Sequence, residues 1–381
     1  MRLTFILFLL TFSTNIFAQT FSHEISTHIG RIVRHNQRLT LPIDHNSWGL
    51  EYALEYQTFG QKQWHRWAQY PRLGIAFSFQ DFGNAQELGL GFGIVPYIGT
   101  DFWRSKTDKV RIFGRLSLGF GYVTEHYDVA TNPRNNFIGT HFSNCSIFKI
   151  GADIRLYPQW RLRPSISFTH YSSGSWKIPN YGINVLALQT GLLYTPNSTA
   201  LTALPQKPNY NIEKGAVEEK PIHRNRYVLS MNFGMGMRET MTDRGPRYPL
   251  YYANIEVAKF LSNLVRWRAG LDYDYITSIE AFLNNKANYD PREAKWQAMR
   301  FAISGGLEYV WNRVSLSTQV GIYLTQNELQ PRPFYIRLLV RVYPFNSPLS
   351  TKRQFNPYLT IGLKTHMITA EYASFGLGFN I

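Results

Sequence analysis

The stretch VRIFGRLSLGFGY, at residues 110–122, decides the fold class of this chain. Its even positions carry mostly large apolar or aromatic side chains, and its odd positions carry two arginines, a serine, two glycines and a phenylalanine. Successive side chains of a β-strand point to opposite faces, so this alternation predicts a strand with one apolar and one polar face. Residues 335–342, YIRLLVRV, repeat the pattern, with Arg337 and Arg341 on the polar face.

The N-terminal residues 1–18 have the pattern of a secretory signal peptide. Arg2 supplies a positive start, residues 3–12 are mostly apolar, and Ala18 is a small residue at the expected cleavage point. No later stretch reaches the roughly 18 apolar residues that a membrane-spanning helix requires. An exported chain of this kind crosses a membrane only as a closed β-barrel, because every backbone polar group must be paired there. The sequence therefore predicts a transmembrane antiparallel β-barrel in the cell outer membrane.

Alternating segments bounded by turn residues number about eight on each side of a break in the pattern. The break, residues 196–225, contains several prolines together with Asn, Lys and Glu, as expected of a linker. We therefore predict an all-β fold of two eight-stranded units in tandem, residues 19–195 and 226–381, with one barrel of about sixteen strands as the alternative. The predicted strands lie near 28–37, 48–58, 71–81, 86–100, 109–123, 144–157, 159–172, 184–195, 226–238, 249–261, 264–277, 296–311, 313–325, 334–344, 355–366 and 370–381.

Charge and cysteine content limit the functions open to this chain. The net charge of +15 favours an anionic partner. An exported chain rarely meets nucleic acid, so the phosphates of lipopolysaccharide are the expected anion; basic loops and a basic lumen are the alternative explanation. Cys145 is the single cysteine, which excludes an intramolecular disulfide. The spacing of His and Cys matches no zinc site, and we predict neither a metal nor another cofactor. His366 and Glu371 are expected to form a solvated surface pair.

The residues most suggestive of chemistry lie around the predicted strand 159–172. His170 and Ser172 share one face of that strand with Ile166 and Phe168, which suits lipid contact. Asn184 lies on the same face at the start of the next strand, so the three polar side chains are expected to cluster outside the barrel wall. A histidine near a serine can act as general base to a serine nucleophile. The same residues are also compatible with a non-catalytic role, as ordinary polar side chains at the depth of the lipid headgroups.

The stretch FTHYSSGSWKIPNYGIN, residues 168–184, resembles the PagL-type lipid A 3-O-deacylases, also known as acyloxyacyl hydrolases. The family pattern is close to H-x-S-N-x-G, then P-N-x-G-I-E, in the last hairpin of an eight-stranded outer-membrane barrel. The segment IGTHF, residues 138–142, is also similar, and LKTHMITAEY, residues 363–372, resembles the C-terminal part of longer relatives. The resemblance implies an ester hydrolase with lipid A, or lipopolysaccharide, and outer-membrane lipids as partners.

The resemblance also implies a role for each residue of the site. His170 matches the family's base and Ser172 its nucleophile, and Ser173 with Gly174 would donate hydrogen bonds to the oxyanion. Ser173 stands where the family has asparagine, and Asn184 stands where the family has the acid that orients the histidine. In serine proteases the comparable change from Asp to Asn lowers the rate about 10⁴-fold. The alternative function is therefore a non-catalytic outer-membrane barrel with a structural or ligand-binding role.

Overall fold

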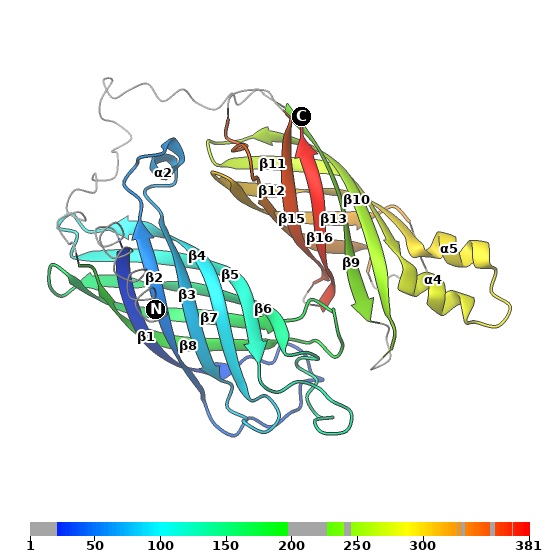
Figure 1. Cartoon of the computed structure of the whole chain (residues 1–381), viewed down its shortest axis with the longest axis horizontal. Helices are drawn as coiled ribbons and strands as arrows, with labels where there is room; N and C mark the ends of the chain where they lie inside the picture. Colours follow the sequence, from blue (N-terminus) through cyan, green and yellow to red (C-terminus); the bar gives the residue numbers. More distant parts are fainter. Residues whose placement is uncertain are drawn as a thin grey trace, which may run out of the picture. The chain divides into compact units, whose positions relative to one another are not determined.

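The computed structural model contains two closed antiparallel β-barrels of eight strands each (Figure 1). It describes residues 21–196, 227–239, 245–325, 327, 329, 332–350, 355–367 and 369–381. The predicted signal peptide and all of the predicted linker except Pro196 lie outside these residues. The prediction of two eight-stranded units is confirmed, and the alternative of one sixteen-stranded barrel is wrong. No helix within the described ranges is long and apolar enough to cross a membrane.

The first barrel joins each strand to its neighbour in the chain, and β8 closes the sheet by pairing with β1. A short helix, α2, lies in the connection between β2 and β3 (Figure 1). The elements are β1 (Phe21–Ile32), β2 (Ser47–Gln57), α2 (Gln63–Trp67), β3 (Arg72–Asp81), β4 (Leu90–Arg104), β5 (Val110–Val123), β6 (Phe142–Arg155), β7 (Trp160–Ser172) and β8 (Ile183–Tyr194).

The second barrel has the same up-and-down order and closes between β16 and β9. Two helices, α4 and α5, fill the connection between β11 and β12. The elements are β9 (Tyr227–Glu239), β10 (Arg247–Phe260), β11 (Val265–Ile276), α4 (Thr277–Asn284), α5 (Pro291–Ala298), β12 (Met299–Trp311), β13 (Val314–Tyr323), β14 (Phe334–Val342), β15 (Asn356–His366) and β16 (Thr369–Asn380).

Both barrels have a polar interior and an apolar exterior. In β5 the guanidinium side chain of Arg111 is 2% exposed, whereas Phe120, on the other face of the same strand, is 77% exposed. In β14 the inward Arg341 is fully buried and the outward Leu338 is exposed. A water-soluble sandwich would bury the apolar face instead, so this arrangement is that of a barrel whose outer surface meets lipid.

The interior charges of the first barrel are paired with one another. Glu51 accepts hydrogen bonds from Arg115 and Lys149 at 2.8 and 2.7 Å between nitrogen and oxygen. Arg163 bridges Glu24 and Glu55, at 2.8 Å to each. Isolated charges in such an interior would carry a large desolvation cost, which opposite charges at hydrogen-bonding distance offset.

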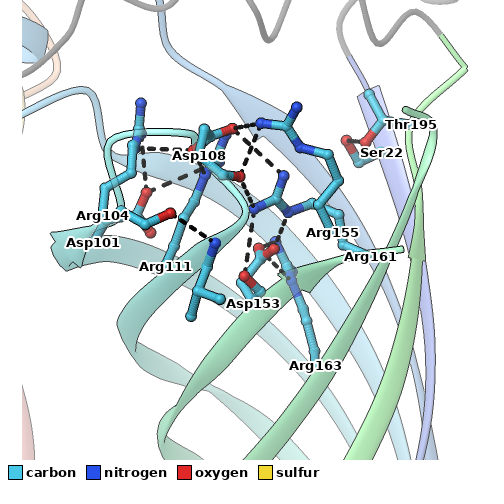
Figure 2. A network of polar contacts seen from close by, with 12 residues as sticks. Ser22, Asp101, Arg104, Asp108, Arg111, Asp153, Arg155, Arg161, Arg163 and Thr195 are labelled. Atoms are coloured by element: carbon cyan, nitrogen blue, oxygen red, sulfur yellow. Dashed lines mark hydrogen bonds and ion pairs between the residues drawn. The ribbon is translucent and has the colours of Figure 1, made fainter. Parts of the chain in front are cut away.

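A denser network of the same kind lies at the end of the first barrel that carries the β4–β5 turn (Figure 2). The turn residue Asp108 accepts from Arg111 at 2.6 Å and from Arg155 at 2.7 Å. Burial alone would raise the pKa of the Asp108 carboxyl, but the hydrogen bond and charge of Arg111, with the charges of nearby arginines, lower it overall. Below this turn, fully buried Asp153 joins Arg161 and Arg163. The network thus ties the turn to the barrel interior.

The second barrel contains an equivalent set of buried ion pairs. Glu308 accepts hydrogen bonds from Arg266 and Arg268, and Glu256 accepts from Arg268 and Arg341 at 2.9 Å each. All five side chains are at most 1% exposed. The interior of this barrel is therefore packed with paired side chains, which is expected of an eight-stranded barrel.

Three sequence-based expectations need correction. The first strand covers Phe21–Ile32 rather than 28–37, and β4 covers Leu90–Arg104 rather than 86–100. Pairing to β2 and to β8, the last strand of this barrel, positions β1, and the local alternation does not reveal a partner as remote in sequence as β8. His366 and Glu371 are not a surface pair: they are 7% and 4% exposed and hydrogen-bonded at 2.9 Å inside the second barrel. The buried Arg300 pairs with the same carboxylate, which explains why a charge at Glu371 is stable there.

Candidate active site

The polar side chains predicted to cluster do lie together at one end of the first barrel. His170, near the end of β7, pairs in register with Asn184, near the start of β8. Both belong to the outward faces of their strands, where Ile166 and Leu186 are 52% and 49% exposed. Ser172, two residues beyond His170, is on the same face at the last position of β7. This end is opposite to the β4–β5 turn, because β7 runs away from it.

The side chain of Asn184 contacts the His170 ring directly. The His170 Nδ1–H donates to Asn184 Oδ1, with 2.5 Å between nitrogen and oxygen. In a neutral imidazole a proton on Nδ1 leaves the lone pair on Nε2, which is the atom that can then accept a proton. The amide of Asn184 therefore selects the histidine tautomer that a general base needs.

A second histidine, which the sequence analysis missed, lies on the other side of Asn184. The Asn184 Nδ2–H donates to His35 Nδ1 at 2.7 Å. His35 belongs to the segment after β1, and the Val33 N–H donates to the Asn184 carbonyl at 2.8 Å, which continues the β1–β8 pairing past the end of β1. The sequence did contain a signal for His35. The outward residues of β1 are at odd positions, and His35 continues that series.

The predicted oxyanion donors lie in the β7–β8 connection, directly after Ser172. The Ser173 N–H donates to Asn180 Oδ1 at 2.9 Å, and Ser173 Oγ donates to the Lys177 carbonyl at 3.2 Å. Gly174 follows with a positive φ of 63°. Asn180, one of the residues shared with the family pattern, thus holds the start of this connection.

The neighbouring strand β6 adds further polar groups on the outward face. Asn144 pairs in register with Ser172, and Ser146 pairs with His170. Ser146 Oγ donates to Asn144 Oδ1 at 2.6 Å. Around Asn144 the outward face is apolar, with Phe142 76% and Phe148 45% exposed. Polar side chains at a lipid-facing position are costly and are usually functional, so this patch across β6, β7 and β8 is the strongest candidate for a site. No group of three or more possible metal ligands occurs in the described part of the chain.

Two family profiles match this chain, one on each barrel. The sequence profile described as "Lipid A 3-O-deacylase (PagL)" matches residues 48–192, which run from β2 to β8 of the first barrel. The profile described as "Acyloxyacyl hydrolase, C-terminal domain" matches residues 225–381, the second barrel. The chain belongs to the PagL family of lipid A deacylases. These profiles describe lipid A deacylases and acyloxyacyl hydrolases, so this chain is a lipid A deacylase by family, and its closed barrels with an apolar outer face fit the outer membrane.

Solved structures resemble the chain only at low identity. The outer membrane enzyme PagL is 15% identical over 44% of this chain and 97% of its own, with a TM-score of 0.29. Neisserial surface protein A (NspA) is 12% identical over 46% and 96%, also with a TM-score of 0.29. Pseudomonas aeruginosa OccK5 (OpdH) is 10% identical over 95% and 97%, with a TM-score of 0.22. At these scores the superpositions add nothing to the family assignment. A search of curated proteins found no match.

Gly182, a glycine of the PagL-family motif, leaves space for the ring of His170 beside the backbone. Its φ is +83°, and a Cβ added there would lie 2.8 Å from His170 Cε1. Gly182→Ala is therefore expected to strain the backbone and displace the ring, lowering the deacylation rate about 10²-fold, the usual cost of a misplacement near 1 Å. The rate of fatty-acid release from lipopolysaccharide by the purified chain measures this effect.

Gly60→Ala is the matched control for this substitution. Gly60 also has a positive φ, of +85°, but lies in the β2–β3 connection at the other end of the barrel. It should carry a similar backbone strain and keep the wild-type rate. An equal loss of rate in both variants would contradict a specific role for Gly182 in holding His170.

Proposed function

We propose that this chain hydrolyses an acyl ester of lipid A, with Ser172 as nucleophile and His170 as general base. The Ser172 hydroxyl attacks the ester carbonyl while His170 Nε2 takes its proton. The tetrahedral intermediate expels the sugar alkoxide, which recovers the proton from His170. Water then hydrolyses the acyl-serine by the same route, releasing a fatty acid and restoring Ser172. No cofactor is required for these steps.

The observation that carries this proposal is the hydrogen bond from His170 Nδ1–H to Asn184 Oδ1. It sets the base tautomer of His170, and Ser172 is on the same outward face about 6–7 Å further along the strand, within side-chain reach. An imidazole oriented in this way without a nearby nucleophile would have no evident purpose at a lipid-facing position.

The position of the site suits a substrate embedded in the membrane. If β1 rises from the periplasm, β7 ends at the outer surface, at the depth of the lipid A esters. The apolar side chains that surround the site on the outward face, such as Leu186 and Phe142, would contact the acyl chains. The phosphates of lipid A would meet exposed basic residues of the connections, such as Arg38 and Arg134, in a chain with a net charge of +15. We also propose that residues 1–18 direct the chain to export.

The oxyanion would be stabilised by Ser173 and the backbone at Gly174. Ser173 gives both of its donors to partners in its own connection, Asn180 and Lys177. The substrate carbonyl would therefore displace one of these partners on binding, and the loss of that hydrogen bond reduces the net gain from the new one. The family's asparagine at this position offers a longer donor.

Ser172→Ala is the direct test. In a serine protease, loss of the serine costs about 2 × 10⁶ in rate and loss of the acid alone about 3 × 10⁴, so a site that already lacks the acid should lose about a further 10²-fold. Mass spectrometry of lipid A from cells expressing the wild type should show loss of one acyl chain. Lipid A from cells expressing Ser172→Ala should remain fully acylated.

Thr190→Ala provides the control for that experiment. Thr190 is an exposed outward hydroxyl on β8, about 20 Å along the strand from Asn184. Its removal should leave deacylation unchanged. If lipid A stays intact with a correctly folded wild type, the chain is instead a non-catalytic barrel, and the amide at Asn184 in place of an acid is the feature that favours this alternative. If Ser172→Ala deacylates as fast as the wild type, Ser172 is not the nucleophile.

A further inference from the structure

The carboxamide of Asn184 holds one histidine at each end. Its oxygen accepts from His170 Nδ1–H at 2.5 Å, and its nitrogen donates to His35 Nδ1 at 2.7 Å. Asn184 is 7% exposed, so water has little access to either hydrogen bond. The three side chains form one continuous line across β7, β8 and the segment that follows β1.

The orientation of an asparagine amide affects which hydrogen bonds it can make, whereas the orientation of a carboxylate does not, so the contact of Asn184 with His35 is important. A carboxylate presents an acceptor oxygen whichever way it is turned, whereas an amide presents an acceptor at one end and a donor at the other. If the Asn184 amide turned over, its NH₂ would face His170 Nδ1, which would then have to accept. The proton of His170 would move to Nε2, and the ring could no longer act as a base toward Ser172.

His35 disfavours this reversal when its own proton is on Nε2, because its Nδ1 then accepts a hydrogen bond and needs the amide nitrogen on its side. With Asn184 reversed, an oxygen would face the Nδ1 lone pair of His35, and both hydrogen bonds would be lost or inverted. The backbone bond from Val33 N–H to the Asn184 carbonyl, at 2.8 Å, keeps the segment that carries His35 beside β8.

We propose that His35 is a positioning residue that fixes the orientation of the Asn184 amide and, through it, the base tautomer of His170. This inference rests on the proposed function, in which His170 is the base. It explains how an amide can occupy the place of the family's acid: the second histidine fixes which end of the amide faces His170. His35 itself touches neither Ser172 nor the reacting atoms in this scheme.

A double-mutant cycle between His35 and Asn184 tests the proposal kinetically. His35→Ala should lower the rate of fatty-acid release by about 10-fold through kcat, with KM little changed, since one hydrogen bond separates the two amide orientations. His35→Gln should restore most of the rate, because its side-chain oxygen can accept from Asn184. In an Asn184→Asp background the same His35→Ala change should alter the rate less than about twofold, because either carboxylate oxygen can accept from His170. His45→Ala, at an exposed histidine of the same β1–β2 connection, is the control and should match the wild type.

Nitrogen NMR of the histidine side chains gives a second readout that does not depend on catalysis. In the wild-type chain the His170 ring should carry its proton on Nδ1, and in His35→Ala a substantial fraction should carry it on Nε2; a His170→Gln variant identifies the signal. If the wild type fails to deacylate lipid A yet the tautomer shifts, the proposed function fails and the positioning role stands. If His35→Ala costs the same in both Asn184 backgrounds, or leaves the tautomer unchanged, the positioning role is wrong.

Discussion

Replacing Asn184 by aspartate is expected to raise the rate of lipid A deacylation, by up to about 10⁴-fold. In serine proteases the third residue of the triad stabilises the imidazolium that forms when the histidine takes the nucleophile's proton, and an amide there costs about that factor. Asn184 Oδ1 already lies 2.5 Å from His170 Nδ1, and aspartate has the same shape. The substitution therefore adds a negative charge without moving the hydrogen bond to His170, while the bond to His35 persists when the His35 proton is on Nδ1. A factor of 10⁴ corresponds to about 5.5 kcal/mol of transition-state stabilisation.

Initial rates of fatty-acid release by the purified wild-type and Asn184→Asp chains measure this effect. Asn184→Leu should be slower than the wild type, because it removes the oxygen that orients His170. The double variant Ser172→Ala with Asn184→Asp should be as slow as Ser172→Ala, since a better oriented base has no nucleophile to activate. An Asn184→Asp rate equal to or below that of the wild type would show that position 184 does not act as the acid does in the family.

The second large effect expected is on stability. Asp153→Asn should lower the free energy of unfolding by about 3–5 kcal/mol, the usual cost of removing one partner from a buried ion pair. Asp153 is fully buried and lies 2.9 Å from Arg163 and 3.2 Å from Arg72, and it also pairs with Arg161 (Figure 2). Asparagine keeps the shape but leaves these guanidinium groups without their common counter-charge. Urea unfolding of the full chain in lipid bilayers, followed by tryptophan fluorescence, measures the change.

Asp44→Asn is the control for that measurement, because it removes one carboxylate from an exposed position in the β1–β2 connection. Exposed charges contribute little to stability, so its unfolding midpoint should match that of the wild type. An unchanged midpoint for Asp153→Asn as well would mean that the other interior carboxylates compensate fully for its loss.

The sequence predicted the architecture closely because a barrel strand carries its own signal. Arg111 and Phe120 differ in parity within one strand, and the structure places one inside and the other outside. Local alternation did not locate β1 correctly. Nor did it indicate the helices α4 and α5, whose buried pairs Ile279 with Leu283 and Ala294 with Ala298 have the four-residue spacing of a helix. A short helix in a connection has a weak pattern, and its packing against neighbouring residues decides whether it forms.

The predictions for the site differ in the same way between local and long-range contacts. The motif from His170 to Asn184 is contained in one hairpin, so residues at most fourteen positions apart were predicted to meet, and the register of β7 and β8 brings them together. The environment of Glu371 was not predictable in this way, because its partner Arg300 is on a strand 71 residues away in sequence. An isolated His and Glu read from the sequence look like a surface pair, and only the closed barrel shows that they are buried.

By itself the sequence determined which face of each strand is polar, because the pleat alternates side chains whatever the strand's neighbours are. It also determined the hairpin that carries His170, Ser172 and Asn184. Only the tertiary structure decided which distant residues meet. Closing the first barrel places β1 beside β8, and this brings His35 against Asn184 across 149 residues of chain. The physical reason is that alternation specifies a side chain's direction but not its partner, which is set by the register and closure of the whole sheet.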